Sequence, residues 1–163
     1  MADVNEAWQH MKPERVVLIV SIDKNGKPDV MPAGWCMHTS GVPSMLAVSV
    51  GHTRYTHKLI NQTKEFVIAL PNKDMIDIIN FTGSCSGRDT DKFKEANIKT
   101  EKSKIVKCPL IADATINFEC KLINQCESGD HTIFVGEILE THMDKKKGVV
   151  LNFGNGVFKE VKK

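Results

Sequence analysis

The sequence predicts a mainly β fold, an antiparallel barrel with helices inserted between its strands. Six or more short segments have the β-branched, aromatic or alternating composition that is typical of strands. The two or three helical patterns interrupt these segments without the regular strand–helix alternation of a doubly wound sheet. A closed antiparallel barrel therefore fits the pattern better. The 163 residues suit one domain, which we expect to span 1–163.

The N-terminal part is expected to form a short helix and a hairpin. A helix over Asn5–Met11 would end before Pro13. Val16–Ile22 is an almost continuous apolar run, typical of a strand buried on both faces. Asn25-Gly26 predicts a hairpin turn, so Asp29–His38 is expected to be the returning strand. The proline and glycine inside that strand indicate an edge, a bulge or the close approach of another group.

Strands and helices then alternate irregularly to the end of the chain. Periodicity and turn residues predict strands at Met45–Val50, Glu65–Leu70, Asp113–Ile123 and His131–Leu139, and a hairpin over Val149–Val161. They also predict a helix over Tyr55–Gln62, a helix over Lys73–Phe81 capped by Asn72, a polar loop at Thr82–Gly87, a short helix over Thr90–Ala96 capped by Asp89, and a charged connector at Thr100–Pro109. The segment Asp113–Ile123 has the clearest alternation of apolar and polar residues in the chain.

Composition argues against several classes of protein. A net charge of +2 does not indicate a nucleic-acid surface. The cysteine count of five is odd and no C-x-x-C occurs, which favours reduced thiols in a cytoplasmic protein. The N-terminus lacks an apolar signal core and no run is long enough to span a bilayer, so we expect no membrane association. The histidines lack zinc-site spacing, and no metal is expected.

The stretch Ser49–Gln62 is the strongest candidate for a binding site. A strand ends at Gly51 and a helix opens near Tyr55. The first turn of a helix leaves backbone N–H groups unpaired, and their partial positive charge suits an anion. Arg54 adds a bidentate donor. The stretch therefore predicts a phosphate seat, although a helix capped by Thr53 or Thr56 beside a solvated arginine remains an alternative.

Other candidates are weaker, and each has a plain structural alternative. There is no G-x-x-x-x-G-K-[ST] phosphate loop and no G-x-S-x-G elbow. Cys85 could be a nucleophile or an inert thiol, Lys92 a ligand or a helix-surface charge, and His131 a functional or an exposed turn histidine. The segment Pro32–Met37 would let a flat group approach its backbone. The segment Ser86–Lys92 offers a hydroxyl group, backbone N–H groups and a positive charge that could bind an anion. A phosphate seat with a planar ring along a strand describes FMN.

Five motifs occur in order between Val16 and Leu139. They are Met31-Pro32-Ala33-Gly34-Trp35, Ser40-x-x-Pro43, Arg54-Tyr55-Thr56 leading to Glu65-Phe66-Val67, Ser86-Gly87-Arg88-Asp89-x-Asp91-Lys92-Phe93, and Gly129-Asp130-His131-x-x-x-x-Gly136-Glu137. This ordered set resembles the flavin-reductase-like, FMN-binding split-barrel family, and within it the flavoredoxin group.

The resemblance implies a six-stranded antiparallel Greek-key split barrel with flanking helices, assembled as a homodimer with FMN near the subunit interface. Arg54, Tyr55 and Thr56 would hold the phosphate. The remaining cofactor-binding candidates are the ring-facing residues Ala33, Gly34, Trp35, Cys36 and Met37, together with Ser49, Ser86 and Lys92. His131 matches a position on the flavin and nicotinamide side and is the catalytic candidate.

Two redox functions follow from the resemblance. The first is an NAD(P)H:flavin oxidoreductase, and the second is a non-enzymatic flavin electron carrier that is reduced by a partner protein. Many reductases of the wider family have Ser or Thr where Gly34-Trp35-Cys36 stands, and a bulky Trp35 could restrict nicotinamide stacking. A third function, oligonucleotide binding by a small barrel, is disfavoured by the low net charge and by only ten aromatic residues (Phe 7, Trp 2, Tyr 1).

Overall fold

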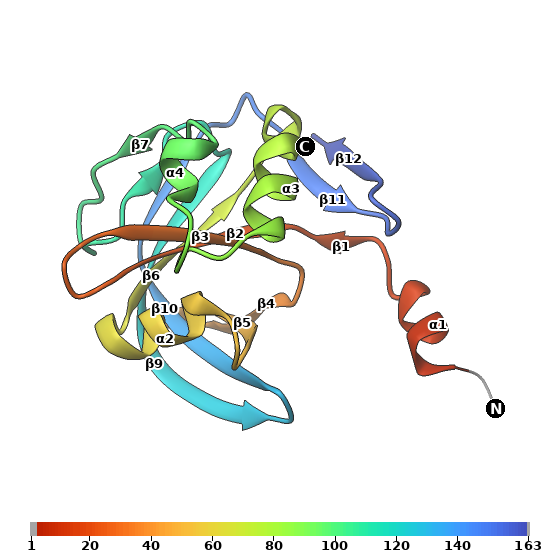
Figure 1. Cartoon of the computed structure of the whole chain (residues 1–163), viewed down its shortest axis with the longest axis horizontal. Helices are drawn as coiled ribbons and strands as arrows, with labels where there is room; N and C mark the ends of the chain where they lie inside the picture. Colours follow the sequence, from red (N-terminus) through yellow and green to blue (C-terminus); the bar gives the residue numbers. More distant parts are fainter. Residues whose placement is uncertain (1–2, 163) are drawn as a thin grey trace.

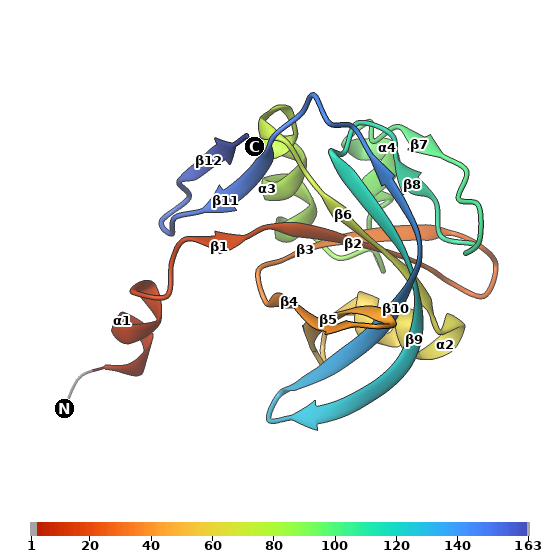
Figure 2. The same ribbon diagram turned by 180° about the vertical axis from the view of Figure 1, so that it is seen from behind.

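The computed structural model describes residues 3–162 and is organised around a seven-stranded antiparallel sheet (Figure 1). The strand order across this sheet is β3-β2-β6-β9-β10-β5-β4. In chain order its strands are β2 (Val17–Ile22), β3 (Pro28–Ala33), β4 (Cys36–Gly41), β5 (Ser44–Gly51), β6 (Glu65–Leu70), β9 (Ile116–Ser128) and β10 (His131–Met143). The reverse view in Figure 2 shows the long β9–β10 hairpin bending across the molecule.

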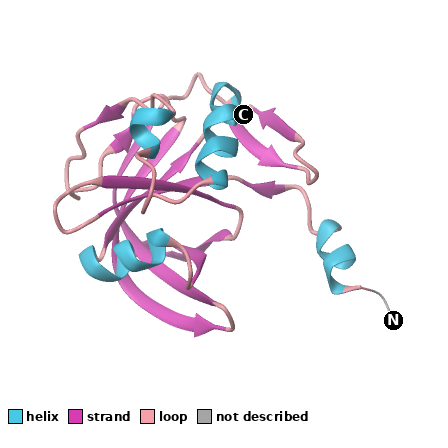
Figure 3. Cartoon of the chain, viewed as in Figure 1, coloured by secondary structure: helices cyan, strands magenta, loops and turns pink. Residues whose placement is uncertain are grey.

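Helices and two small sheets surround this large sheet (Figure 3). The helices are α1 (Val4–Gln9), α2 (Tyr55–Thr63), the 3₁₀ turn η1 (Lys73–Met75), α3 (Ile76–Ser84) and α4 (Lys92–Glu95). A three-stranded sheet contains β1 (Glu14–Arg15), β11 (Val149–Asn152) and β12 (Phe158–Val161), and a two-stranded sheet contains β7 (Thr100–Glu101) and β8 (Leu110–Ile111). Helix α1 projects away from the body of the molecule (Figure 1).

The expectation of one continuous strand over Asp29–His38 was wrong. The segment divides at Gly34 and Trp35 into β3, which pairs with β2 at one edge of the sheet, and β4, which pairs with β5 at the other edge. A Cβ at Gly34 would overlap the carboxylate of Glu14, so a larger residue at the break would require the Glu14 side chain to move. The Trp35 carbonyl accepts a hydrogen bond of 2.9 Å from the Ser49 N–H.

The division gives a split barrel, as the family resemblance implies, and not the closed barrel that the strand pattern alone favoured. The two edges of the sheet belong to consecutive segments of the chain, so the sheet must curl back on itself to connect them. Within residues 3–162 no ladder joins β3 to β4. The sheet has seven strands and not the expected six, because one expected strand is interrupted. We call the gap between the edge strands β3 and β4, beside Gly34, the seam of the barrel.

Two hydrophobic clusters lie on the opposite faces of the sheet, and β2 contributes to both. Leu18 and Val20 pack into the cluster shared with helices α3 and α4, while Val17 and Ile19 pack into a second cluster shared with β5, β6 and β10. Every residue of β2 is buried. The predicted two-faced burial of this strand is confirmed, and the second cluster fills the interior of the curled sheet.

Two polar residues in the first half of β9, Asn117 and Glu119, are buried. Glu119 is 0% exposed, and its carboxylate accepts hydrogen bonds from the N–H groups of Lys104, Ile105 and Val106 at 2.7–2.9 Å. His142 Nε2 lies 2.7 Å from the same carboxylate. Burial tends to raise the pKa of Glu119, but these hydrogen bonds outweigh burial and lower it. Within the expected charged connector, the loop at 104–106 is therefore held by one buried carboxylate.

Two expected boundaries changed and one cap was confirmed. The expected polar loop at Thr82–Gly87 is partly helical, because α3 continues to Ser84. Helix α4 is capped by Asp91, whose side chain accepts from the Lys94 N–H, and the predicted cap Asp89 lies in the preceding turn. The side chain of Asn72 accepts from the Asp74 N–H, as predicted. No helix in the described part of the chain is long and apolar enough to cross a membrane.

Candidate functional site

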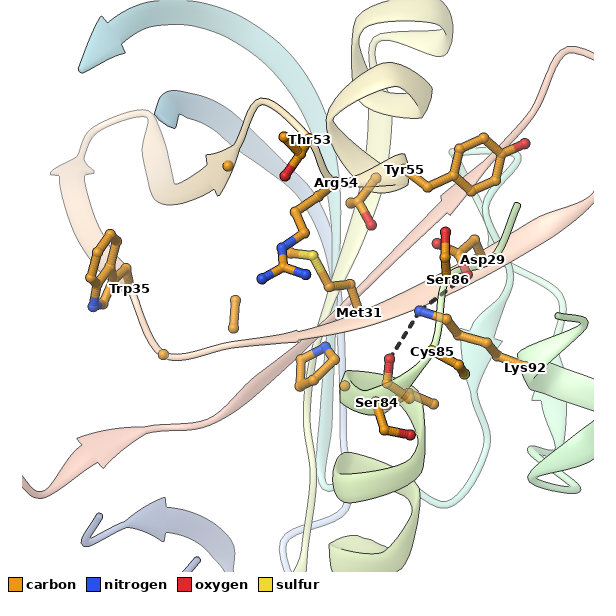
Figure 4. A pocket seen from close by; sticks show the side chains of 18 of the residues that line it. Asp29, Met31, Trp35, Thr53, Arg54, Tyr55, Ser84, Cys85, Ser86 and Lys92 are labelled. Carbon is orange, nitrogen blue, oxygen red and sulfur yellow. Dashed lines mark hydrogen bonds and ion pairs between the residues drawn. The ribbon is translucent and has the colours of Figure 1, made fainter. Parts of the chain in front are cut away.

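A cavity of about 510 Å³ lies where the seam of the barrel meets α2 and the connection between α3 and α4 (Figure 4). The end of β3 and the Gly34–Trp35 break form one side. The connection from β5 to α2 forms the second side, and residues 82–88 form the third. Three loops that are distant in the sequence therefore meet around one cavity.

The N-terminus of α2 opens onto this cavity without a side-chain cap. Arg54 occupies the N-cap position with an extended backbone, and capping of the helix by a side-chain hydrogen bond is absent among residues 3–162. The expectation that Thr53 or Thr56 caps the helix was wrong, because Thr56 is the second helical residue and is buried. The first-turn N–H groups remain available to an anion. The Arg54 side chain extends into the cavity and forms no ion pair with any of residues 3–162 (Figure 4).

Arg88 is a functional candidate that the sequence reasoning did not single out. Its Nη1 donates a 3.1 Å hydrogen bond to the carbonyl of Thr53, and its guanidinium lies 5.3 Å from the centre of the Tyr55 ring. Arg88 thus connects the α3–α4 loop to the start of α2 and adds a second positive charge to this side of the cavity. Its place in the motif Ser86-Gly87-Arg88-Asp89 was the available signal.

Lys92 is buried beneath the cavity, so its interpretation as a helix-surface charge was wrong. Its Nζ donates to the carbonyls of Val30 at 2.8 Å and Thr82 at 2.9 Å, and lies 3.6 Å from Asp29 Oδ1. Both charged side chains are 4% exposed. Burial raises the pKa of Asp29, and the nearby Lys92 only partly opposes this. Lys92 lines the cavity, but its ammonium is directed at protein oxygens and holds β3, α3 and α4 together.

The loop above this ion pair approaches it very closely. A Cβ on Gly87 would overlap the Asp29 carboxylate, so only glycine allows the loop to lie at this depth. Asp29 Oδ2 is buried and has no hydrogen-bond partner among the described residues. Cys85 also lines the cavity, and its thiol donates to the Phe81 carbonyl at 3.5 Å.

Aromatic residues form the mouth of the cavity. The Trp35 side chain is 51% exposed, and its ring centre lies 4.8 Å from that of His131 and 6.1 Å from that of Trp8 in α1. His131 Nδ1 lies 2.6 Å from Asp130 Oδ1. The hydrogen bond from His131 holds the pKa of the Asp130 carboxyl below its ordinary value. His131 is thus oriented by its neighbour and packed against the indole.

Most of the residues predicted for the site line this one cavity. Those that do are Ala33, Gly34, Trp35, Ser49, Arg54, Tyr55, Thr56, Ser86, Lys92 and His131. Cys36 and Met37 do not, because the chain turns away after Trp35, and their side chains line a different cavity. Asp29 was not selected from the sequence. Met31, Cys85 and Arg88 stood in the quoted motifs or among the weaker candidates, but none was assigned to the cofactor, and all three line the cavity with Asp29.

A sequence model of the flavin reductase like domain matches residues 10–162. The chain belongs to this family. An uncharacterized protein of Archaeoglobus fulgidus is 40% identical to it over 147 residues, which covers 90% of this chain and 82% of the relative. Because this relative is uncharacterized, its similarity does not indicate a particular activity for the chain.

Solved structures agree with the assignment to the flavin reductase like family. A flavoredoxin from Methanosarcina acetivorans superposes with a TM-score of 0.83 at 26% identity, covering 93% of this chain and 86% of that one. An FMN-binding protein from Thermus thermophilus superposes with a TM-score of 0.84 at 23% identity, covering 95% and 90%. The split-barrel fold of this flavin reductase like protein is thereby confirmed.

Proposed function

We propose that the protein binds FMN in the cavity beside α2 and acts as an NAD(P)H:flavin oxidoreductase. The observation that carries the proposal is the uncapped N-terminus of α2 next to an arginine without an ion pair among residues 3–162. A phosphate dianion is the ligand that suits this arrangement best. Its oxygens can accept hydrogen bonds from the helix N–H groups and two more from the guanidinium. Membership of the flavin reductase like family supports a flavin as the group that carries this phosphate.

The rest of the cavity also fits a flavin. The backbone at the seam is accessible because β3 is an edge strand and Gly34 has no side chain. An edge strand presents unpaired N–H and C=O groups, which match the polar rim of an isoalloxazine ring. The residues that would hold the phosphate are Arg54, the first turn of α2 and Ser86, and the backbone of 33–35 would face the ring.

Bound FMN supplies the hydride and electron chemistry, and the protein supplies position and electrostatics. Hydride transfer depends more on alignment than on proton transfer, so we assign no acid–base pair. Trp35 and His131 shape the opening through which a donor reaches the cavity, and Asp130 fixes the orientation of the His131 ring. The Lys92–Asp29 pair keeps the floor of the cavity in place from below.

The experiment is a flavin titration followed by a turnover assay. The purified protein is expected to take up FMN, to quench its fluorescence on binding, and to give a yellow complex that bleaches under dithionite. The complex is then expected to oxidise NADH or NADPH with free flavin as acceptor. A colourless protein that takes up no added FMN would exclude the proposed cofactor, and with it this function.

A second candidate is a flavin electron carrier that takes its electrons from a redox-partner protein. The half-exposed Trp35, packed between Trp8 and His131, occupies the mouth where a nicotinamide would have to stack. The similarity to a flavoredoxin is consistent with this role. No turnover of the FMN complex with either nucleotide, together with new turnover in Trp35→Ser, would favour the carrier.

We also propose that the protein is a homodimer, as the family resemblance implies. Val4 and Trp8 on α1 and Met11 just after it are apolar and 49–75% exposed. Their spacing places them along one side of the helix that projects from the body. Sedimentation equilibrium is expected to give twice the chain mass, and a monomer at all concentrations would contradict the proposal.

A further inference from the structure

We propose a second binding site, for a small amphipathic carboxylate, in a cavity separate from the candidate flavin cavity. A separate cavity of about 280 Å³ opens where the interior of the curled sheet meets β1, β11 and β12. It shares no lining residue with the candidate flavin cavity. Small molecules commonly bind in the mouths of β-barrels.

The walls of this cavity continue the hydrophobic interior of the barrel. Val17, Leu46 and Ile68, from three different strands, form its deepest part and are 0–4% exposed. Nearer the surface, Met37 and Met143 are 59% and 55% exposed although they line the same cavity. A concave apolar surface that remains open to water indicates a ligand site, and methionine side chains adapt to varied apolar shapes.

The ionisable side chains that line the cavity, other than Cys36, are all basic. Arg15, His38, Lys145 and Lys147 line it, and no aspartate or glutamate of residues 3–162 does. Lys147 is partly engaged, since its Nζ donates to the Asp113 carbonyl at 3.1 Å and lies 3.8 Å from Asp144 Oδ2. Arg15 and Lys145 form no ion pair within residues 3–162.

The positive charge of Arg15 acts on Cys36, a residue of the cavity wall. Burial raises the pKa of the Cys36 thiol to about 11, and the Arg15 guanidinium opposes that rise. Cys36 is therefore a neutral wall residue at physiological pH, while Arg15 supplies a positive field over the apolar interior. An apolar body with one anionic head complements this arrangement, because a guanidinium binds a carboxylate bidentately.

Isothermal titration of the whole protein with decanoate and with decan-1-ol, both below their aggregation limits, tests the proposal. Decanoate is expected to bind at one site about tenfold more tightly than the alcohol, which is the effect of one charge-assisted hydrogen bond. Arg15→Gln is expected to remove that difference and leave alcohol binding unchanged. Lys102→Gln, which removes an exposed charge outside the cavity, is the matched control and should change neither affinity.

A second variant and two competition measurements complete the test. Met143→Trp fills the opening from an exposed position and is expected to weaken both ligands. Saturating FMN should leave decanoate binding unchanged, since the two cavities are separate. Equal affinity for decanoate and the alcohol, binding of neither, or competition by FMN would each overturn the proposal. Loss of decanoate binding as protein concentration rises would overturn it too, because a second copy of the chain would then cover the mouth.

Discussion

Arg54 is the side chain on which the proposed phosphate seat most directly depends. Arg54→Ala is expected to weaken FMN binding by about 2 kcal/mol, roughly thirtyfold, through the loss of a charge-assisted hydrogen bond. Fluorescence titration measures this change. Lys58→Ala is the control, because Lys58 is an exposed cation on the same helix that does not line the cavity. If Arg54→Ala binds FMN as tightly as the wild type, Arg54 does not contact the phosphate.

Lys92 and Asp29 are expected to act on stability rather than on direct cofactor contact. Lys92→Met leaves the buried Asp29 carboxyl without its countercharge and is expected to lower the free energy of unfolding by about 3 kcal/mol. Urea denaturation measures the loss. The double variant Asp29→Asn, Lys92→Met removes both charges and should recover a large part of it. Equal losses in the single and double variants would show that the pairing of charges is unimportant here.

At the scale of elements, the α3–α4 loop controls one side of the cavity. Gly87→Ala places a Cβ against the Asp29 carboxylate, so the loop must move outward with Ser86 and Arg88. We expect a loss of about 1–3 kcal/mol in stability and weaker FMN binding. Thermal unfolding and flavin titration measure these effects. Gly41→Ala is the matched control, because a Cβ there meets nothing within 4 Å, and equal behaviour of both variants would contradict the close packing.

The same scale shows what periodicity can and cannot predict. It located β6 without error and α2 to within one residue, because each is bounded by a turn residue or a proline. It missed the division of Asp29–His38. The proline and glycine there indicated an irregularity, but only pairing with different partners separates the segment into two strands. The cap at Asp91 rather than Asp89 was also missed, because two aspartates precede one short helix.

At the scale of the whole molecule, Glu119 is expected to govern part of the acid stability. The pKa of Glu119 is lower in the folded chain than its ordinary value of 4.5. The ionised carboxylate therefore stabilises the fold above pH 4.5, and this contribution disappears as the pH falls through the lower folded pKa. Glu119→Gln is expected to cost about 3 kcal/mol at pH 7 and progressively less towards pH 3.

Urea unfolding at several pH values measures this convergence. Glu101→Gln, at an exposed position on a two-residue strand, is the control and should follow the wild type throughout. A constant difference between Glu119→Gln and the wild type from pH 7 to pH 3 would contradict the assigned hydrogen-bonded carboxylate. It would mean that the packing of the side chain at position 119, and not its negative charge, stabilises the loop at 104–106.

The candidate site was predictable where one segment forms it and unpredictable where several segments meet. Arg54, Tyr55 and Thr56 are consecutive at a strand-to-helix turn, which is a pattern that local chemistry can recognise. Asp29 and Cys85 reach the cavity only because the sheet curls and α3 packs on β3. No short pattern carries that information. Cys36 and Met37 illustrate the converse, because proximity to Trp35 in sequence does not place them in the same cavity.

The seam beside Gly34 has a consequence for the protein before it acquires a cofactor. Edge strands are sites at which separate chains can join by strand addition, and β3 and β4 are the two edges of the large sheet. A flavin over the seam would cover the unpaired backbone there. Newly synthesised chains in flavin-starved cells would then be the ones most prone to self-association, and cofactor supply would influence how much of the protein survives.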